Sequence, residues 1–481
     1  MSLKRKFKND LKKDVDLSFD NSALESNVKP SKSRIKIITS RIVAACILVP
    51  LSIVIIAPIV FVIATMKDSV SDAKRTYTLN EIRNLSSTSF KSLNSISYPH
   101  ITNLNEFNHD EKEAYLNYVD KIYKNLDPSQ NMMFSPLTLY GFFTGSYKAL
   151  SNEEYVTKYE NLLGLNENQL ISFYKKMFEN NYFANNDGIV QLHNGVFIDT
   201  LNDECEISEK YIDYLTKVYT DCYSMDFKNN KDVDLMIKWI NQSIGETNFI
   251  TKNDIPATSD TIIGFFSTMN FNLEWKSKFV KKNTYDGKFF IDSSTSVSTK
   301  YMTHNFGSYY YDYGKYISVH DYYSYSYSIT YIVPKSIDDN IYDLIGDKNL
   351  FIEDAEQIYE PNIELHVPKF NITKMIDFKK LITNLGMPKM FDYPNNALGN
   401  VYEEGKGPGP VFLEALKQKN TIKLNEDGTI IKSVNIGMAG TAKAGEGNAL
   451  VVNLNQPFIY IVKDSSGMPI YVGHIDNPTI E

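Results

Sequence analysis

A stretch of small residues near the C-terminus constrains the fold of this 481-residue chain more than any other feature. It follows an acidic turn, Glu426-Asp427-Gly428-Thr429, and a β-branched run from Ile430 to Ile436. The residues up to Leu450 are then rich in Gly and Ala, which bury too little apolar surface to order themselves. The front end, by contrast, has the composition of a strand. An ordinary long hairpin connection is one interpretation; an exposed loop that can become a strand is the other.

The composition excludes several functions. A hydrophobic content of 43% fits a globular protein, and a net charge of −8 argues against nucleic acid as the main partner. Three Cys make no disulfide framework, and Cys205 could pair with Cys222 only if the fold brings them together. The seven His are scattered without ligand spacing, and no hydrolase, metal or phosphate-loop motif occurs. We therefore expect no catalytic residues, metal or cofactor, and a protein that is not an enzyme.

The N-terminal part predicts a membrane anchor. Residues 1–41 carry eleven Lys and Arg against five Asp and Glu, which indicates a disordered basic tail. Ile42 to Met66 is free of charge over 25 residues, enough to cross a bilayer core of about 30 Å. A cleaved signal peptide fits less well, because the leading region is too long and no A-x-A site follows. Basic residues before the run favour a cytoplasmic N-terminus.

The rest of the chain is then expected outside the cell. Residues 67–104, rich in Ser, Asn and Thr, are interpreted as a stalk, and residues 105–481 as one globular domain. Helical periodicity marks 110–126, 137–150, 206–219, 233–244 and 376–385. Strand-like runs occupy 189–198, 261–271, 327–333, 363–370, 458–462 and 470–474. The irregular mixture predicts an α+β fold with a large mixed sheet. The Tyr-rich strands of 309–331 are expected at a sheet surface, and Trp239 and Trp275 in the core.

Six motifs, in chain order, carry a family resemblance. They are Asn131-Met132-Met133-Phe134-Ser135-Pro136-Leu137-Thr138; Asn194-Gly195-Val196-Phe197-Ile198 with Met225-Asp226-Phe227; Met236-Ile237-Lys238-Trp239-Ile240; Asn270-Phe271-Asn272-Leu273-Glu274-Trp275; Leu365-His366-Val367-Pro368-Lys369-Phe370 with Leu385-Gly386-Met387; and Pro457-Phe458-Ile459-Tyr460-Ile461 with Gly473-His474-Ile475-Asp476-Asn477-Pro478. At this spacing the chain resembles a serpin, a serine protease inhibitor, from about Glu106 to Pro478.

The resemblance implies a function as a suicide substrate. A serine protease would cleave the exposed loop, and the freed front half would insert as an extra strand into the central sheet. The resemblance assigns the loop hinge to Glu426, Gly428, Thr429, Ile431 and Ser433. It places Ser135 and Thr138 in the shutter beneath the sheet, and Trp275 at the breach where the loop enters.

The bond to be cleaved is placed only by counting from Gly428. The count gives Ala442–Lys443 or, one residue further, Lys443–Ala444. Lys443 before the bond would indicate a trypsin-like target, and Ala442 an elastase- or subtilisin-like one. A solvated loop lysine without a role is the simpler interpretation of Lys443. The acidic balance argues against a polyanion site without excluding one, and a monomer is expected.

Some residues depart from the family pattern. Ile431-Lys432-Ser433-Val434 stands where inhibitory serpins carry Ala-like residues, so bulk is expected to slow insertion. Asn435 would point inward and would need hydrogen-bond partners or cost about 1–3 kcal/mol. Ser267, Asn270 and Leu273 stand where the family usually has Asn, Tyr and Gly, and Gln418-Lys419-Asn420 lacks a His often found there. A non-inhibitory serpin, serving as a surface binding or adhesion module, is the alternative function.

Overall fold

The computed structural model describes residues 86–99, 104–126, 131–185, 188–199, 205–255, 260–347, 350–352, 356–430 and 449–480. The predicted tail (1–41), the predicted membrane span (42–66) and the loop residues 431–448 lie outside the described residues. The chain divides into two compact units, Met1–Ser71 and Asp72–Glu481, and all described residues lie in the second. Within the described ranges, no helix has the length and apolar character needed to cross a membrane.

The first sheet holds the hinge of the loop. Its described strands run in the order β1 (Lys91–Ser92), β5 (Thr220–Met225), β4 (Gly188–Asp199), β6 (Ile263–Glu274), β14 (Gly428–Ile430), β13 (Lys417–Asn425) and β12 (Phe370–Asp377). A further strand, β3 (Tyr182–Asn185), pairs with β4. The central strands β4 and β6 are antiparallel over most of their length, whereas β4 and β5 are parallel. Strands distant in sequence therefore lie side by side around β14.

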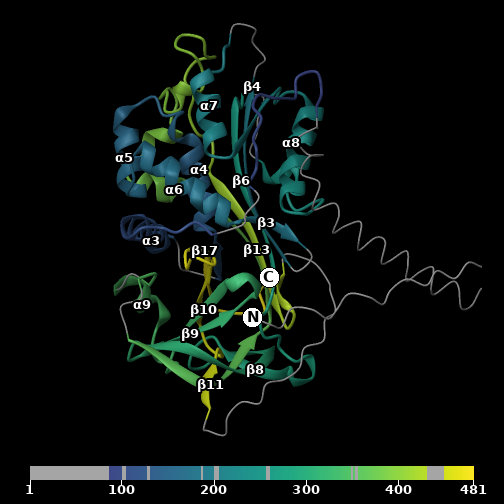
Figure 1. Ribbon diagram of the computed structural model, residues 1–481, viewed down its shortest axis with the longest axis vertical. Coiled ribbons are helices and arrows are strands. Elements are labelled where there is room, and N and C mark those ends of the chain that lie inside the picture. Colours follow the sequence, from purple (N-terminus) through teal and green to yellow (C-terminus); the bar gives the residue numbers. More distant parts are fainter. Residues whose placement is uncertain are drawn as a thin grey trace, which may run out of the picture. The chain divides into compact units, whose positions relative to one another are not determined.

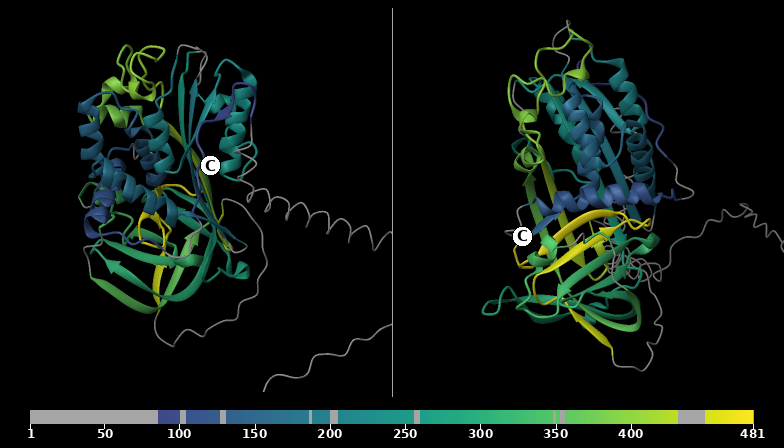
Figure 2. Two further views of the ribbon diagram at one scale, coloured as in Figure 1. Left: turned by 45° about the horizontal axis from the view of Figure 1, so that its top comes forward. Right: turned by 90° about the vertical axis from the view of Figure 1, so that its left-hand side faces the viewer.

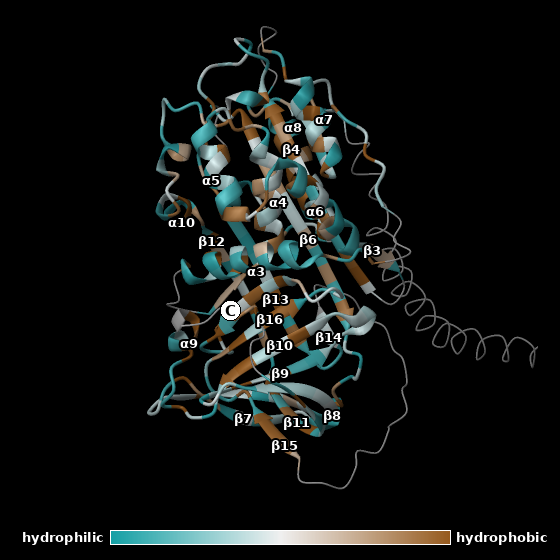
Figure 3. Cartoon of the chain, turned by 60° about the vertical axis from the view of Figure 1, so that its left-hand side comes forward, coloured by the Kyte–Doolittle hydropathy of each residue, from teal (hydrophilic) through white to brown (hydrophobic). Residues whose placement is uncertain are grey.

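The second sheet receives the other end of the loop. Its described strands follow the order β15 (Leu450–Asn453), β11 (Gln357–Pro368), β8 (Ser296–Asp312), β9 (Tyr316–Tyr322), β10 (Ser328–Pro334), β16 (Phe458–Lys463), β17 (Pro469–Ile475) and β2 (Met132–Phe134), with β7 (Tyr285–Phe290) beside β8. Because β16 and β17 have neighbours on both sides and buried side chains throughout, the C-terminal segment is part of the core (Figure 3).

Helices cover both faces of the first sheet (Figures 1 and 2). On one face lie α3 (His109–Lys124), α4 (Pro136–Tyr147), α5 (Glu153–Leu163), α6 (Glu167–Asn180) and α7 (Glu209–Lys217). The opposite face carries α8 (Asn230–Ser243). Two short helices, α9 (Ile341–Asp347) and α10 (Lys379–Asn384), complete the described set. Every residue of α4 is buried, as expected of an apolar helix beneath a sheet.

The sequence patterns located most elements correctly. The helix predicted over 137–150 begins as expected, with Ser135 at the N-cap and Pro136 at the first position. The predicted α+β class is confirmed, and Trp239 and Trp275 are buried. The helices α5 and α6 were not predicted. Cys205 and Cys222 form no disulfide.

Two sequence predictions differ from the structure. The Tyr-rich strands lie only partly at a sheet surface: Tyr311, Tyr316, Tyr323, Tyr327 and Tyr331 are buried, whereas Tyr309 and Tyr325 are exposed. The second difference concerns residues 86–99, which were assigned to the stalk. Phe90 is completely buried, and Lys91–Ser92 pair with β5. The packed part of the chain therefore begins before residue 104.

Candidate strand-insertion site

The hinge of the loop already lies inside the first sheet. Thr429 is paired with Leu273 of β6 on one side and with Leu424 of β13 on the other, antiparallel to both. Gly428 is needed at this entry, because a Cβ there would overlap the carbonyl oxygen of Leu273 and lie 2.9 Å from the Cα of Glu274. The first residues of a new strand are thus in place between β6 and β13.

Two stacked aromatic side chains support the side chain of Thr429 at the hinge. The hydroxyl of Thr429 lies 2.5 Å from the hydroxyl of Tyr323, and both residues are buried. The Tyr323 ring stacks on Trp275 with the ring centres 4.4 Å apart. Trp275 in turn donates its indole N–H to the carbonyl of Asn425, at 2.8 Å. These contacts fix the position along β6 and β13 at which the loop enters the sheet.

A buried ion pair holds the turn before the hinge. The ammonium of Lys369 lies 2.8 and 3.0 Å from the two carboxylate oxygens of Glu426, which is only 6% exposed. Thr284 donates a further hydrogen bond of 2.8 Å to the same carboxylate. Burial opposes the ionisation of Glu426, but the hydrogen bonds from Lys369, from its own backbone and from Thr284 outweigh it, so the pKa of this carboxyl lies below its usual value.

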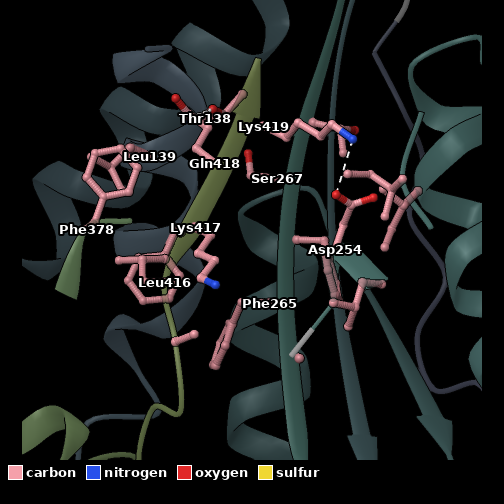
Figure 4. Close-up of a pocket in the computed structure, with 18 of the residues that line it drawn as sticks. Thr138, Leu139, Asp254, Phe265, Ser267, Phe378, Leu416, Lys417, Gln418 and Lys419 are labelled. Carbon is pink, nitrogen blue, oxygen red and sulfur yellow. Dashed lines mark hydrogen bonds and ion pairs between the residues drawn. The ribbon is translucent and has the colours of Figure 1, made fainter. Parts of the chain in front are cut away.

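Below the hinge the sheet is open. No ladder pairs β6 with β13 in the described part of the chain, and a cavity of about 300 Å³ lies between them. Figure 4 shows Phe265 and Ser267 of β6 on one side of this opening and Lys417 and Gln418 of β13 on the other. We call this opening the slot. It lies below β14, between the same two strands.

The floor of the slot is polar where Gln418 meets α4. The Gln418 amide donates to the carbonyl of Ser135 at 3.0 Å and to the hydroxyl of Thr138 at 2.7 Å, and it accepts from the backbone N–H of Ser135 at 2.8 Å. Asn420 donates to the side-chain oxygen of Gln418 at 2.8 Å. Gln418 lies in the segment where the family pattern often has a His, and the hydrogen bonds of its amide join β13 to α4.

The predicted site residues divide into two groups. Glu426, Gly428 and Thr429 lie with Trp275 at the entrance, and Ser135 and Thr138 lie beneath the slot. Ile431, Ser433, Ala442, Lys443 and Ala444 lie outside the described residues. In the described ranges no group of His, Cys, Asp and Glu could hold a metal ion.

Sequence reasoning missed Tyr323. It lies 106 positions before Thr429, so no local pattern connects the two. The pairing of Lys369 with Glu426 was also missed, although Lys369 lies within the Pro368-Lys369-Phe370 motif that carried the resemblance.

The hinge and the slot define a protein in which the start of a loop is paired within the central sheet, above an opening between the same two strands. A family profile described as "Serpin (serine protease inhibitor)" matches residues 113–478. The chain belongs to the serpin family.

Curated relatives include viral inhibitors. Serine proteinase inhibitor 1 of Vaccinia virus (strain Copenhagen) is 24% identical over 367 residues, covering 72% of this chain and 95% of that protein. Serpin B13 of Homo sapiens is 25% identical over 281 residues, covering 56% of this chain and 70% of that protein.

Solved structures share the fold. The native state of tengpin, a thermophilic serpin, has a TM-score of 0.64 at 19% identity and covers 78% of this chain and 96% of its own. Cleaved Serpin 42Da has a TM-score of 0.64 at 18% identity and covers 77% and 99%. These structures confirm the serpin fold predicted from the sequence.

Proposed function

We propose that this protein inhibits a serine protease as a suicide substrate. The observation that carries the proposal is β14, paired on both sides above an unfilled slot. A segment that already has its first three residues in the sheet can extend downward residue by residue, and each step adds ladder hydrogen bonds to β6 and β13. The relatives named serine proteinase inhibitors support the same conclusion.

Cleavage releases the strand. The protease serine attacks a loop carbonyl, forms an acyl-enzyme and expels the new amine, which remains on the β15 side of the break and takes the proton from the protease histidine. The acylated side remains attached to Thr429. As it fills the slot, the bound protease is carried along the sheet before water can hydrolyse the ester. Trapping therefore depends on insertion being faster than deacylation.

The target is set by the residue before the cleaved bond. Lys443 at that position would select a trypsin-like protease, and Ala442 an elastase- or subtilisin-like one. Residues 42–66 would anchor the chain in the membrane, with the inhibitory domain outside the cell. This location rests on the uncharged run and the basic residues before it.

A mixing experiment tests the proposal. The full chain in detergent is incubated with trypsin, elastase or subtilisin and separated on a denaturing gel. A covalent band at the summed mass, lost in Thr429→Arg, is expected, because a charged side chain cannot replace the hydroxyl beside buried Tyr323. Lys423→Ala, an exposed position on β13, is the matched control and should retain the band.

The alternative is a non-inhibitory serpin. The departure at Ile431 and Lys432 is the observation that favours it. This function predicts clean cleavage of the loop by all three proteases, without a covalent band and without any gain in thermal stability.

A further inference from the structure

The segment 86–94, which we call the brace, closes the outer edge of the first sheet. Lys91 and Ser92 pair with Ser224 and Tyr223 of β5, and the N–H of Leu93 donates to the carbonyl of Cys222 at 2.7 Å. The Asn94 side chain accepts from the N–H of Cys222 at 2.9 Å and donates to Thr216 and to the carbonyl of Thr220, both at 3.0 Å. These bonds make the brace the edge strand of the sheet.

The brace also holds α8. The Ser87 hydroxyl donates to the carboxylate of Asp232 in the first turn of α8, at 2.6 Å, and Asp232 is fully buried. Phe90, with no exposed surface, packs between the sheet and α8. Its cluster comprises Phe197, Tyr223, Met225, Phe227, Met236, Trp239 and Ile240. Figures 1 and 2 show this purple segment beside α8.

The segment that follows α8 is tied to β13 by the Lys419 side chain. Asn241 of α8 holds the following turn by two hydrogen bonds to the backbone of Ile250, at 2.7 and 2.8 Å. Lys419 of β13 then donates to the carbonyl of Phe249 at 2.9 Å and pairs with Asp254 at 3.2 Å. Figure 4 shows the Lys419 side chain extending over β6 to Asp254. A continuous set of contacts thus runs from the brace on β5, along α8, to β13.

Insertion of a strand would disturb this set of contacts. A full strand between β6 and β13 needs each neighbour about 4.8 Å away, so β13 must move away from β6 wherever the slot is narrower than that, and Lys419 then moves away from Asp254 unless α8 shifts with it. A shift of α8 would in turn pull Phe90 and Ser87 from their partners.

We propose that the brace keeps α8 seated and thereby slows strand insertion. The inference rests on the proposed function, because insertion is the event that the brace controls. In the sequence the brace follows the predicted membrane span, so the segment nearest the anchor is also the one that restrains the sheet. If the contacts of residues 86–94 were lost, the loop would insert into the sheet before a protease had cleaved it.

The experiment measures insertion without a protease complex. Full-length wild type, Phe90→Ala and Ser87→Ala are held at 37 °C, and the loop-inserted form is followed by its higher thermal unfolding midpoint. Trp239 and Trp275 are the two tryptophans of the chain, so intrinsic fluorescence follows α8 and the hinge over the same period. Phe90→Ala should convert at least tenfold faster than wild type and Ser87→Ala severalfold faster. Lys91→Ala, whose side chain is exposed, should convert at the wild-type rate.

Two results would overturn the inference. Brace variants that unfold at lower temperature but convert at the wild-type rate would show that residues 86–94 only stabilise the fold. If Phe90→Ala does not fold, an unchanged rate in Ser87→Ala has the same meaning. A wild-type chain that gains no stability even after loop cleavage would instead overturn the proposed function, and this inference with it.

Discussion

At the scale of single residues, the hydroxyl of Tyr323 is the contact that identifies Thr429 as the first inserted residue. Tyr323→Phe removes one buried hydrogen bond and leaves the Thr429 hydroxyl without it, which should lower the free energy of unfolding of the intact protein by about 1 kcal/mol. Thermal unfolding of the uncleaved protein measures the loss. Tyr331→Phe is the control, since the Tyr331 hydroxyl has no hydrogen-bond partner in the described part of the chain. Equal losses in Tyr323→Phe and Tyr331→Phe would show that the effect comes from packing and not from the hydrogen bond to Thr429.

The Glu426 carboxylate makes the hinge sensitive to acid. Its pKa is lower in the folded protein than the ordinary value of 4.5, so its ionised form stabilises the fold above that pH. This contribution falls as the pH drops from about 4.5 through the lower folded-state pKa. Glu426→Gln should therefore cost about 1.5–3 kcal/mol at pH 7 and less at pH 3.5, read from thermal unfolding.

The control for this titration is a surface pair. Asp286 pairs with Lys300 at 2.9 Å but is 79% exposed, so Asp286→Asn should leave stability unchanged at both pH values. A loss in Glu426→Gln that is equally large at pH 3.5 and pH 7 would contradict the assigned role of the ionised carboxylate.

At the scale of elements, the register of β14 predicts which residues of β6 and β13 an inserted loop would face. Continuing it one residue at a time sets Ile431 opposite Phe271 and Ile422, which are both buried and apolar. The bulk that the sequence analysis expected to slow insertion would therefore meet apolar partners. The same register sets Asn435 opposite Ser267 and Gln418, above Thr138.

We therefore expect the Asn435 side chain of the inserted loop to form hydrogen bonds with polar side chains in the slot, such as those of Gln418 and Thr138. Asn435→Ala should lower the stability of the cleaved, inserted form by about 1–2 kcal/mol while leaving the uncleaved form unchanged. Lys432→Ala, which points outward in this register, is the control. Thermal unfolding of each protein after cleavage measures the difference, and an unchanged midpoint for Asn435→Ala would mean a different register.

The elements also show what the sequence could reveal. Local signals located α3 and α4, because caps and apolar periodicity act within one helix. The Tyr-rich strands were placed only partly correctly, because period-two alternation identifies two faces but not how far each is covered. The brace was interpreted as a stalk because its Ser and Asn side chains bond partners more than a hundred positions away, such as Asp232 and Thr216. Only the family motifs carried such long-range information, and they did so for the hinge and the shutter.

At the scale of the whole molecule, the slot predicts a gain in stability on cleavage. An inserted strand replaces water in the slot and adds ladder hydrogen bonds to β6 and β13, so the cleaved protein should unfold at a higher temperature than the intact protein. Scanning calorimetry before and after limited cleavage with subtilisin measures the rise. Thr429→Arg, cleaved in the same way, should show little of it. A cleaved wild type that melts where the intact protein does would mean that the slot stays empty.

The position of β16 and β17 has one more consequence. A cut within the loop leaves a C-terminal fragment that contains both strands, flanked by β10 on one side and β2 on the other. That fragment cannot dissociate without opening the core, so the cleaved molecule remains one particle made of two chains. No product leaves and no intact loop is regenerated. Under the proposed mechanism each copy would act once, so the number of copies would set how much protease can be removed.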